Sequence, residues 1–301
     1  MKVDERRRVR AFAPGHVTGI FAPATDAREP RARGSRGAGL VLELGVVAEA
    51  AFHPGPRRIV QVSSAPAVPL PISSDVAERL APPGGRTVVR LTHQLPVGQG
   101  FGMSAAGATA TALAISALAG TPRSGAVATA HLADLFGGGG LGGVAAILGG
   151  GLELRRSPGI PPWGRVEHRP VRAPLFVAVA GGPMPSPRLL FDSRVLAQLE
   201  RAAIGLDDLL RHPSLPRFLD ASERFTDRVG IAPPTVTAVL RGLRRRGAWA
   251  AQAMFGRSLF AAPRTEGARQ EIVRWLLERR IPAVELRPAR SGARVGRPQP
   301  F

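Results

Sequence analysis

The stretch "PVGQGFGMSAAGATATALAIS", residues Pro96–Ser116, is a glycine-rich run that leads directly into an uncharged, alanine-rich segment. Its composition predicts a helix over Met103–Leu118. The first backbone N–H groups of a helix have no partner within it, and glycines let a ligand approach them closely. The run therefore indicates a phosphate-binding loop. A glycine-rich turn before a helix packed closely by small residues is the alternative that these residues leave open.

Composition narrows the class of protein. The chain has 301 residues, 44 % of them hydrophobic, which is enough for one large or two ordinary globular domains. Lysine and arginine together number 41, and Lys2 is the only lysine, so the net charge of +19 comes from arginine. The arginines are scattered and no aromatic residues lie between them to stack bases. We therefore expect no nucleic-acid partner.

Missing residue types exclude several kinds of site. Without cysteine the chain has no disulfide, thiolate or cysteine-ligated metal. A Walker A loop, a protein-kinase ATP site and a Schiff base each need a lysine in a defined motif, and Lys2 lies in none. The N-terminus lacks the apolar segment of a secretory signal, and Met103–Gly120 is too weakly apolar to insert into a membrane. We expect a cytoplasmic protein with no membrane partner.

The pattern of strands and helices predicts an α+β fold. Arg57–Ser64 and Arg86–His93 alternate as strands do, and Gly39–His53 predicts a hairpin about Gly45. Helices are predicted over Ser124–Phe136 and Glu266–Arg280. The proline-rich interval from Ser157 to Gly164 predicts a linker, so we expect two domains, residues 1–160 and 161–301, that meet at a cleft.

The pattern P-x-G-x-G-F-G-x-S-A-A-G resembles the nucleotide-binding loop of the GHMP kinase superfamily. The resemblance implies ATP as the bound nucleotide and Mg²⁺ as its metal. Ser104 would begin the helix and offer its hydroxyl to Mg²⁺ or to a phosphate oxygen. The residues that the resemblance assigns to ATP are Pro96, Gly98, Gly100, Phe101, Gly102, Ser104, Ala105, Ala106 and Gly107.

Further stretches resemble one branch of that superfamily, the archaeal pantoate kinases. They are "APGHVTGIF" (Ala13–Phe21), "GSRGAG" (Gly34–Gly39), "AHLADLFGGGGLGGVAAILGGGLELR" (Ala130–Arg155), "GGPMPSPRLLFD" (Gly181–Asp192), "SERFTDRVGI" (Ser222–Ile231), "AMFGRSLFA" (Ala253–Ala261) and "SGARV" (Ser291–Val295). The resemblance implies an N-terminal domain like domain 2 of ribosomal protein S5 and a ferredoxin-like C-terminal α/β sandwich. It also implies a homodimer that phosphorylates pantoate to 4-phosphopantoate, with ATP, in coenzyme A biosynthesis.

The resemblance assigns catalytic roles to Ser104 and Asp134, both also as ligands of Mg²⁺. Asp134 stands where the family has a glutamate on the helix after the phosphate loop. The family's catalytic aspartate follows Gly-Leu-Gly, and this chain has Gly143 there. His131 and Asp192 are the substitutes that we consider for the missing base. Another small-molecule GHMP kinase, or a GHMP-fold protein impaired by Gly143, remains the alternative function.

Substrate residues are predicted from chemistry and position together. A small carboxylate is well held by a bidentate arginine, and Arg36 lies between glycines in "GSRGAG". His16 and Thr18 follow a Pro-Gly pair and suit hydrogen bonds to substrate hydroxyls. Met254 and Gly256 match the family's third glycine motif, which lines the cleft.

Overall fold

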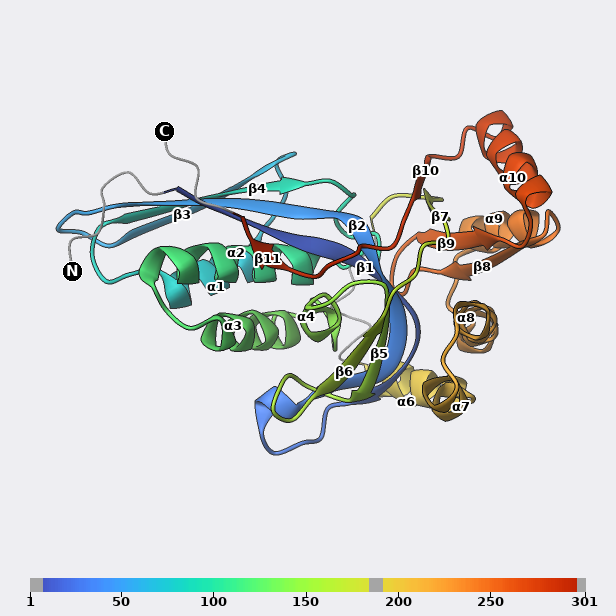
Figure 1. The fold of residues 1–301 in the computed structure, drawn as a ribbon, viewed down its shortest axis with the longest axis horizontal. Coiled ribbons are helices and arrows are strands. Elements are labelled where there is room, and N and C mark those ends of the chain that lie inside the picture. The colour runs from blue at the N-terminus through green and yellow to red at the C-terminus, as the bar shows by residue number, and fades with distance from the viewer. Residues whose placement is uncertain (1–7, 184–191, 297–301) are drawn as a thin grey trace.

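The computed structural model describes residues 8–183 and 192–296. Met184–Phe191, which belong to one of the stretches compared above, lie outside the described residues. The described chain is mixed α+β, as expected, and is built on two sheets (Figure 1).

The first sheet has seven strands, in the order β11-β1-β2-β4-β3, with β5 paired to β2 and β6 to β5. Their bounds are β1 Arg8–Ala24, β2 Gly34–His53, β3 Ile59–Ala65, β4 Arg86–His93, β5 Leu152–Ser157, β6 Arg165–Arg169 and β11 Arg294–Val295. The short helix η1 (Pro30–Ala32) joins β1 to β2.

The predicted hairpin about Gly45 is wrong, because β2 continues through that residue as one strand. Gly45 pairs with Pro14 of β1, and a Cβ on Gly45 would lie 2.1 Å from the carbonyl oxygen of Ala13. The glycine thus permits a close approach of two strands and makes no turn.

Helix α1 (Pro71–Leu80) connects β3 to β4, and helices α2 (Met103–Ala119), α3 (Arg123–Phe136) and α4 (Gly143–Ala146) lie between β4 and β5 in the chain. Figure 1 shows α1, α2 and α3 on one face of the sheet. Nearly every residue of α2 from Met103 to Ser116 is buried, because the helix lies between the sheet and its neighbouring helices. Small alanine and glycine side chains permit that close packing.

The second sheet is antiparallel, in the order β10-β7-β9-β8. Its strands are β7 Leu175–Val179, β8 Ala248–Gln252, β9 Ser258–Pro263 and β10 Ala283–Leu286, and its helices are α6 Ser193–Ala202, α7 Leu206–Arg211, α8 Leu215–Val229, α9 Pro234–Arg244 and α10 Glu266–Glu278. Helices α9 and α10 bury one face in a cluster around Phe176, Leu240 and Trp275. Helix α8 lies on the other face (Figure 1).

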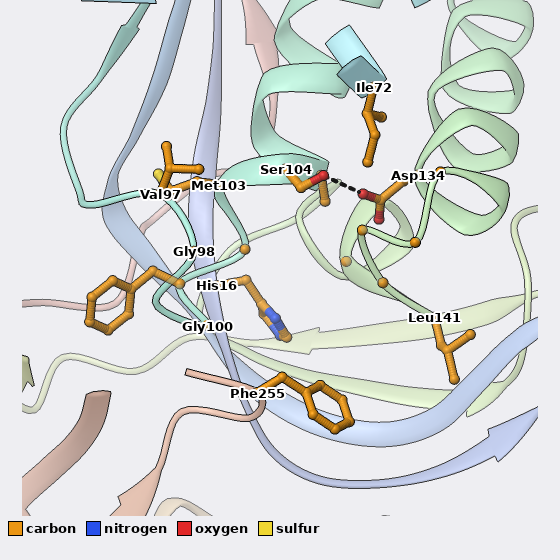
Figure 2. A pocket seen from close by; sticks show the side chains of 18 of the residues that line it. His16, Ile72, Val97, Gly98, Gly100, Met103, Ser104, Asp134, Leu141 and Phe255 are labelled. Carbon is orange, nitrogen blue, oxygen red and sulfur yellow. Dashed lines mark hydrogen bonds between the residues drawn. The ribbon is translucent and has the colours of Figure 1, made fainter. Parts of the chain in front are cut away.

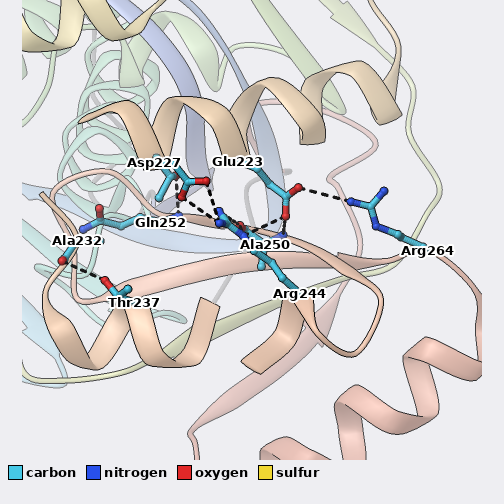
Figure 3. Close-up of polar contacts among 9 residues, drawn as sticks. Glu223, Asp227, Ala232, Thr237, Arg244, Ala250, Gln252 and Arg264 are labelled. Atoms are coloured by element: carbon cyan, nitrogen blue, oxygen red, sulfur yellow. Dashed lines mark hydrogen bonds and ion pairs between the residues drawn. The ribbon is translucent and has the colours of Figure 1, made fainter. Parts of the chain in front are cut away.

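Helix α8 joins the two sheets. Phe218 and Ser222 of α8 lie so close to Gly19 of β1 that a Cβ on Gly19 would approach the Ser222 hydroxyl to 2.0 Å. On its other side, Glu223 accepts a hydrogen bond from the Ala250 amide of β8 at 2.8 Å, and Arg244 of α9 donates to Asp227 at 2.9 Å (Figure 3). These contacts hold the second sheet against the first.

The chain returns to the first sheet at its described end. β11 pairs with β1 at Ala11 and Phe12, and the Ala293 amide donates to the Ile147 carbonyl at 2.8 Å. Both β6 and β11 follow residue 160 and pair within the first sheet, and the division of the chain at that position stays a prediction. Among the described residues, none of the helices is long and apolar enough to cross a membrane.

Candidate active site

An open cavity of about 670 Å³ lies between strands of the first sheet and connections of the second sheet. Its wall combines β1, the loop before α2, the first turn of α2, the start of α1, the glycine loop between α3 and α4, β5 and the turn after β8. Figure 2 shows Ser104 of α2 facing Asp134 of α3, with His16 and Phe255 farther along the same cavity. The site therefore draws on segments far apart in the sequence.

The loop before α2 has the backbone of an anion site. Gly98, Gly100 and Gly102 adopt φ angles of +75°, +75° and +68°, which residues with a side chain rarely adopt. A Cβ on Gly100 would also lie 2.7 Å from the carbonyl oxygens of Ala253 and Met254. Among the described residues no side chain caps α2, so the N–H groups of its first turn are available to a ligand in the cavity.

Ser104 and Asp134 form the polar pair beside this helix start. The Ser104 hydroxyl donates to Asp134 Oδ1 at 2.9 Å, and Asp134 is 2 % exposed. Burial raises the pKa of Asp134 to about 7, which the hydrogen bond from Ser104 partly opposes. Of the carboxylates in the described part of the chain, only Asp134 lines the cavity.

A second polar cluster lies at the other side of the cavity. His16 Nε2 donates to Glu153 Oε1 at 2.9 Å, and Arg155 Nη1 donates to the same oxygen. All three side chains are buried, and His16 and Arg155 line the cavity. Burial lowers the pKa of His16 and so favours the neutral ring. Burial opposes ionisation of Glu153, yet Arg155 and His16 together hold its pKa below the ordinary value.

The sequence interpretation missed Glu153 and Arg155. Two residues apart on β5, they lie on the same face of the strand. The available signal was an acid and a base that alternate with Leu152 and Leu154 at the start of the strand after the glycine loop.

Most of the predicted site residues come together. Those that line the cavity are His16, Thr18, Gly98, Gly100, Phe101, Gly102, Ser104, Ala105, Asp134 and Met254. Pro96, Ala106, Gly107 and Gly256 do not line it. Gly256 supports the loop from behind, because a Cβ there would lie 2.1 Å from the Gln99 carbonyl oxygen.

Arg36 lies outside this cavity. It borders a smaller pocket of about 390 Å³, where its guanidinium donates to Asp207 and to the Arg156 carbonyl. In the cavity wall, Arg155 is the buried arginine, and its Nε has no hydrogen-bond partner among the described residues. In the described part of the chain, Arg155 is thus the arginine that lines this cavity, and Arg36 does not line it.

The candidates for a general base also lie elsewhere. His131 is buried, does not line the cavity, and its Nε2 has no hydrogen-bond partner among the described residues. Asp192 is exposed and caps α6 through the amides of Arg194 and Val195. Gly143 does line the cavity, but a Cβ there would lie 2.7 Å from Ala105 Cβ and 3.8 Å from Asp134 Oδ2. Close packing against α2 therefore leaves no ready space for a side chain at 143.

Comparison with known sequences reveals archaeal relatives. The pantoate kinase of Thermococcus kodakarensis is 33 % identical over 269 residues, which cover 86 % of this chain and 89 % of the relative. The pantoate kinase of Methanospirillum hungatei is 29 % identical over 274 residues, covering 85 % and 88 %. No family model matches the chain.

Solved structures give the same picture of the fold. A "phosphotransferase related to CoA biosynthesis pathway" superposes with a TM-score of 0.85 at 29 % identity, covering 96 % of this chain and 99 % of the other. Mevalonate kinase of L. major superposes with a TM-score of 0.67 at 16 % identity, over 96 % and 99 % of the two chains. The predicted two-domain GHMP kinase fold is thereby confirmed. With a relative more than 30 % identical over most of its length, the chain belongs to the pantoate kinase family.

Proposed function

We propose that this chain transfers the γ-phosphoryl group of ATP to the primary hydroxyl of pantoate, giving 4-phosphopantoate for coenzyme A biosynthesis. The observation that carries the proposal is that a single cavity contains both the free start of α2 and a buried arginine, Arg155. The first suits a polyphosphate and the second a carboxylate. Relatives named pantoate kinase support this choice of substrate.

The phosphates would lie against the loop and the first turn of α2, with Ser104 and Asp134 beside them. Mg²⁺ in kinases is held by one or two carboxylates together with substrate phosphates. No group of three or more His, Cys, Asp or Glu side chains that could hold a metal occurs in residues 8–183 and 192–296, so the nucleotide must complete the site. Ser104 and Asp134 are oxygen donors that fit this ion. When bound, Mg²⁺ would neutralise charge on the phosphates.

Pantoate would occupy the opposite side of the cavity. Its carboxylate would bind the guanidinium of Arg155, the arginine that lines the cavity in the described part of the chain. His16 and Thr18 would bind the hydroxyl groups, and the apolar side chains of Met254 and Phe255 suit the two methyl groups. This arrangement directs the free hydroxymethyl end away from Arg155 and toward the phosphate loop.

The substrate hydroxyl would react without a dedicated carboxylate base, because Gly143 replaces the aspartate. Phosphoryl transfer has a loose transition state, so positioning and charge stabilisation carry most of the catalysis. A general base typically adds about 10²–10⁴-fold. We therefore expect an active, slower kinase in place of the impaired GHMP-fold protein that was considered as an alternative. We also propose a homodimer, which sedimentation velocity would test.

The test is ADP release by the purified chain with ATP, Mg²⁺ and D-pantoate, beside homoserine, mevalonate and a control without acceptor. We expect turnover that depends on pantoate. Turnover with homoserine or mevalonate in its place would make this another small-molecule kinase, and turnover with none of them would contradict kinase function.

A matched pair of arginine variants tests the substrate side. Arg155→Lys keeps a positive charge beside Glu153 but loses the bidentate guanidinium, so the KM for pantoate should rise on the order of 10-fold while the KM for ATP stays. Arg36→Gln should leave both constants unchanged. The reverse pattern would return the carboxylate site to Arg36.

A further inference from the structure

Glu153 is a buried carboxylate without an assigned role. It is 0 % exposed, and its Oε1 accepts hydrogen bonds from both His16 and Arg155. Its own atoms do not line the cavity, whereas both of its partners do. A buried carboxylate is costly unless it is paired, so its place in this wall requires an explanation.

The neighbouring strand is shaped to admit this cluster. Across the sheet, Gly39 of β2 lies between Thr18 of β1 and Glu153 of β5. A Cβ on Gly39 would approach His16 Nε2 to 2.3 Å, and a Cβ on Gly37 would approach Arg155 Nη2 to 2.6 Å. Both glycines belong to the "GSRGAG" stretch. Their absent side chains leave the space in which the His16 ring crosses β2 to reach Glu153.

The hydrogen bonds to Glu153 fix the orientation of the two cavity residues, His16 and Arg155. An ionised carboxylate only accepts, so His16 must carry its proton on Nε2 and leave Nδ1 as an acceptor. The Thr18 hydroxyl lies 3.4 Å from that Nδ1. With Nη1 of Arg155 held by Glu153, its Nε remains the buried donor without a partner among the described residues.

We propose that Glu153 is a positioning residue, which holds Arg155 and His16 in the orientation that binds the carboxylate and hydroxyl of the acceptor. This inference rests on the proposed function. It also gives a reason for the glycines of the "GSRGAG" stretch: Gly37 and Gly39 make room for Arg155 and His16, and Arg36 is not needed for this. Loss of the negative charge leaves the Arg155 guanidinium buried without its counter-ion and frees it to turn from the cavity.

The test compares Glu153→Gln with Glu167→Gln. Glu167 lies on the adjacent strand β6, pairs with Arg156 and Arg169, and does not line the cavity, so it is the matched control. For Glu153→Gln we expect a KM for pantoate raised about tenfold or more, with the KM for ATP unchanged. At the same pantoate concentration, pantoate should raise the melting temperature of Glu153→Gln less than that of the wild-type chain, while ATP with Mg²⁺ should raise both equally. Glu167→Gln should behave as the wild-type chain.

Glu153→Asp keeps the charge on a shorter side chain and should show an intermediate KM for pantoate. If Glu153→Gln does not fold, the same readouts on Glu153→Asp decide. A wild-type KM for pantoate in the Glu153 variants, an equal rise for both substrates, or the same effect in Glu167→Gln would overturn the inference. Absence of pantoate turnover and of pantoate-induced stabilisation in the wild-type chain would overturn the proposed function, and the inference with it.

Discussion

At the scale of single residues, Ser104 connects the phosphate loop to the carboxylate of the site. It lies in the first turn of α2 and its hydroxyl donates to Asp134 at 2.9 Å. The same oxygen lines the cavity beside the free N–H groups of the helix. Its removal would leave Asp134 without its described side-chain partner and, under the proposed function, would remove an oxygen ligand beside the phosphates.

Ser104→Ala should therefore lower kcat on the order of 100-fold, as loss of one transition-state donor typically does. Ser116→Ala is the matched control, because Ser116 lies near the other end of α2 and hydrogen-bonds to Thr121 at 2.6 Å. Steady-state kinetics of both variants check this. Equal activity of the two would remove Ser104 from the site.

The raised pKa of Asp134 predicts a pH dependence of stability in the absence of nucleotide and metal. Between the ordinary value of 3.8 and about 7, folded Asp134 holds a proton that the unfolded chain has released. Unfolding then releases this proton, so the Asp134 contribution is complete below pH 3.8 and is lost as pH rises through about 7.

Asp134→Asn should remove that slope, which reaches at most about 1.4 kcal/mol per pH unit. Urea unfolding of both proteins from pH 4 to pH 8 measures it. The difference in unfolding free energy should shift in favour of the variant as pH rises. If the unfolding free energies of the two proteins depend on pH in the same way, the folded chain does not hold Asp134 in its protonated form.

At the scale of elements, the start of α4 packs against the first turn of α2. Because a Cβ on Gly143 would meet Ala105 Cβ at 2.7 Å, Gly143→Asp should destabilise the fold by about 1–3 kcal/mol and not raise turnover. Adding Ala105→Gly makes room, so the double variant should exceed Ala105→Gly alone in kcat. A stable and faster Gly143→Asp would contradict this packing.

Helices proved predictable where residues that favour a helix form a long segment. The predicted helix over Met103–Leu118 is confirmed as Met103–Ala119, and that over Glu266–Arg280 as Glu266–Glu278. The predicted hairpin in β2 was wrong because of Gly45. This glycine allows two strands to approach closely, and a sequence alone does not distinguish such a glycine from one that forms a turn. Periodicity and turn rules carry no information on which neighbour a missing side chain accommodates.

The residues that line the cavity were predictable in the loop before α2 and less so on the side of Arg155. The loop is a continuous segment, so its motif identifies it. Arg155 was missed because its role depends on β5 lying beside β2 and on its burial with Glu153, which only the fold establishes. Arg36 was preferred for its glycine neighbours, yet those glycines make room for other residues.

At the scale of the whole molecule, residues 292–295 near the described end of the chain pack against the first sheet and its helices. Gly292 lies against Leu148, where a Cβ would approach the carbonyl carbon to 2.2 Å, and Arg123 donates to the Ala293 carbonyl at 2.7 Å. Residues 292–293 thus pack against the segment after α4 and the start of α3, and β11 also contacts α2. Loss of this packing should loosen the sheet edge at β1, which β11 covers.

Gly292→Ala should therefore lower the unfolding free energy by about 1–3 kcal/mol and speed amide exchange along β1. Gly125→Ala is the control, since no atom lies within 4 Å of the added Cβ and alanine favours its helix by up to about 1 kcal/mol. Unchanged unfolding free energy and unchanged amide exchange in Gly292→Ala would show that the segment around Gly292 does not stabilise the first sheet.

The start of α2 and the side chain of Arg155 line the same cavity, which is the basis of the proposed reaction. The most direct test is ³¹P NMR of the product formed from ATP and D-pantoate in the presence of Mg²⁺. We predict a new phosphomonoester resonance split into a triplet by the two protons of the hydroxymethyl carbon. A doublet, from the secondary hydroxyl, or no new resonance beyond those of ATP hydrolysis, would contradict the proposed reaction.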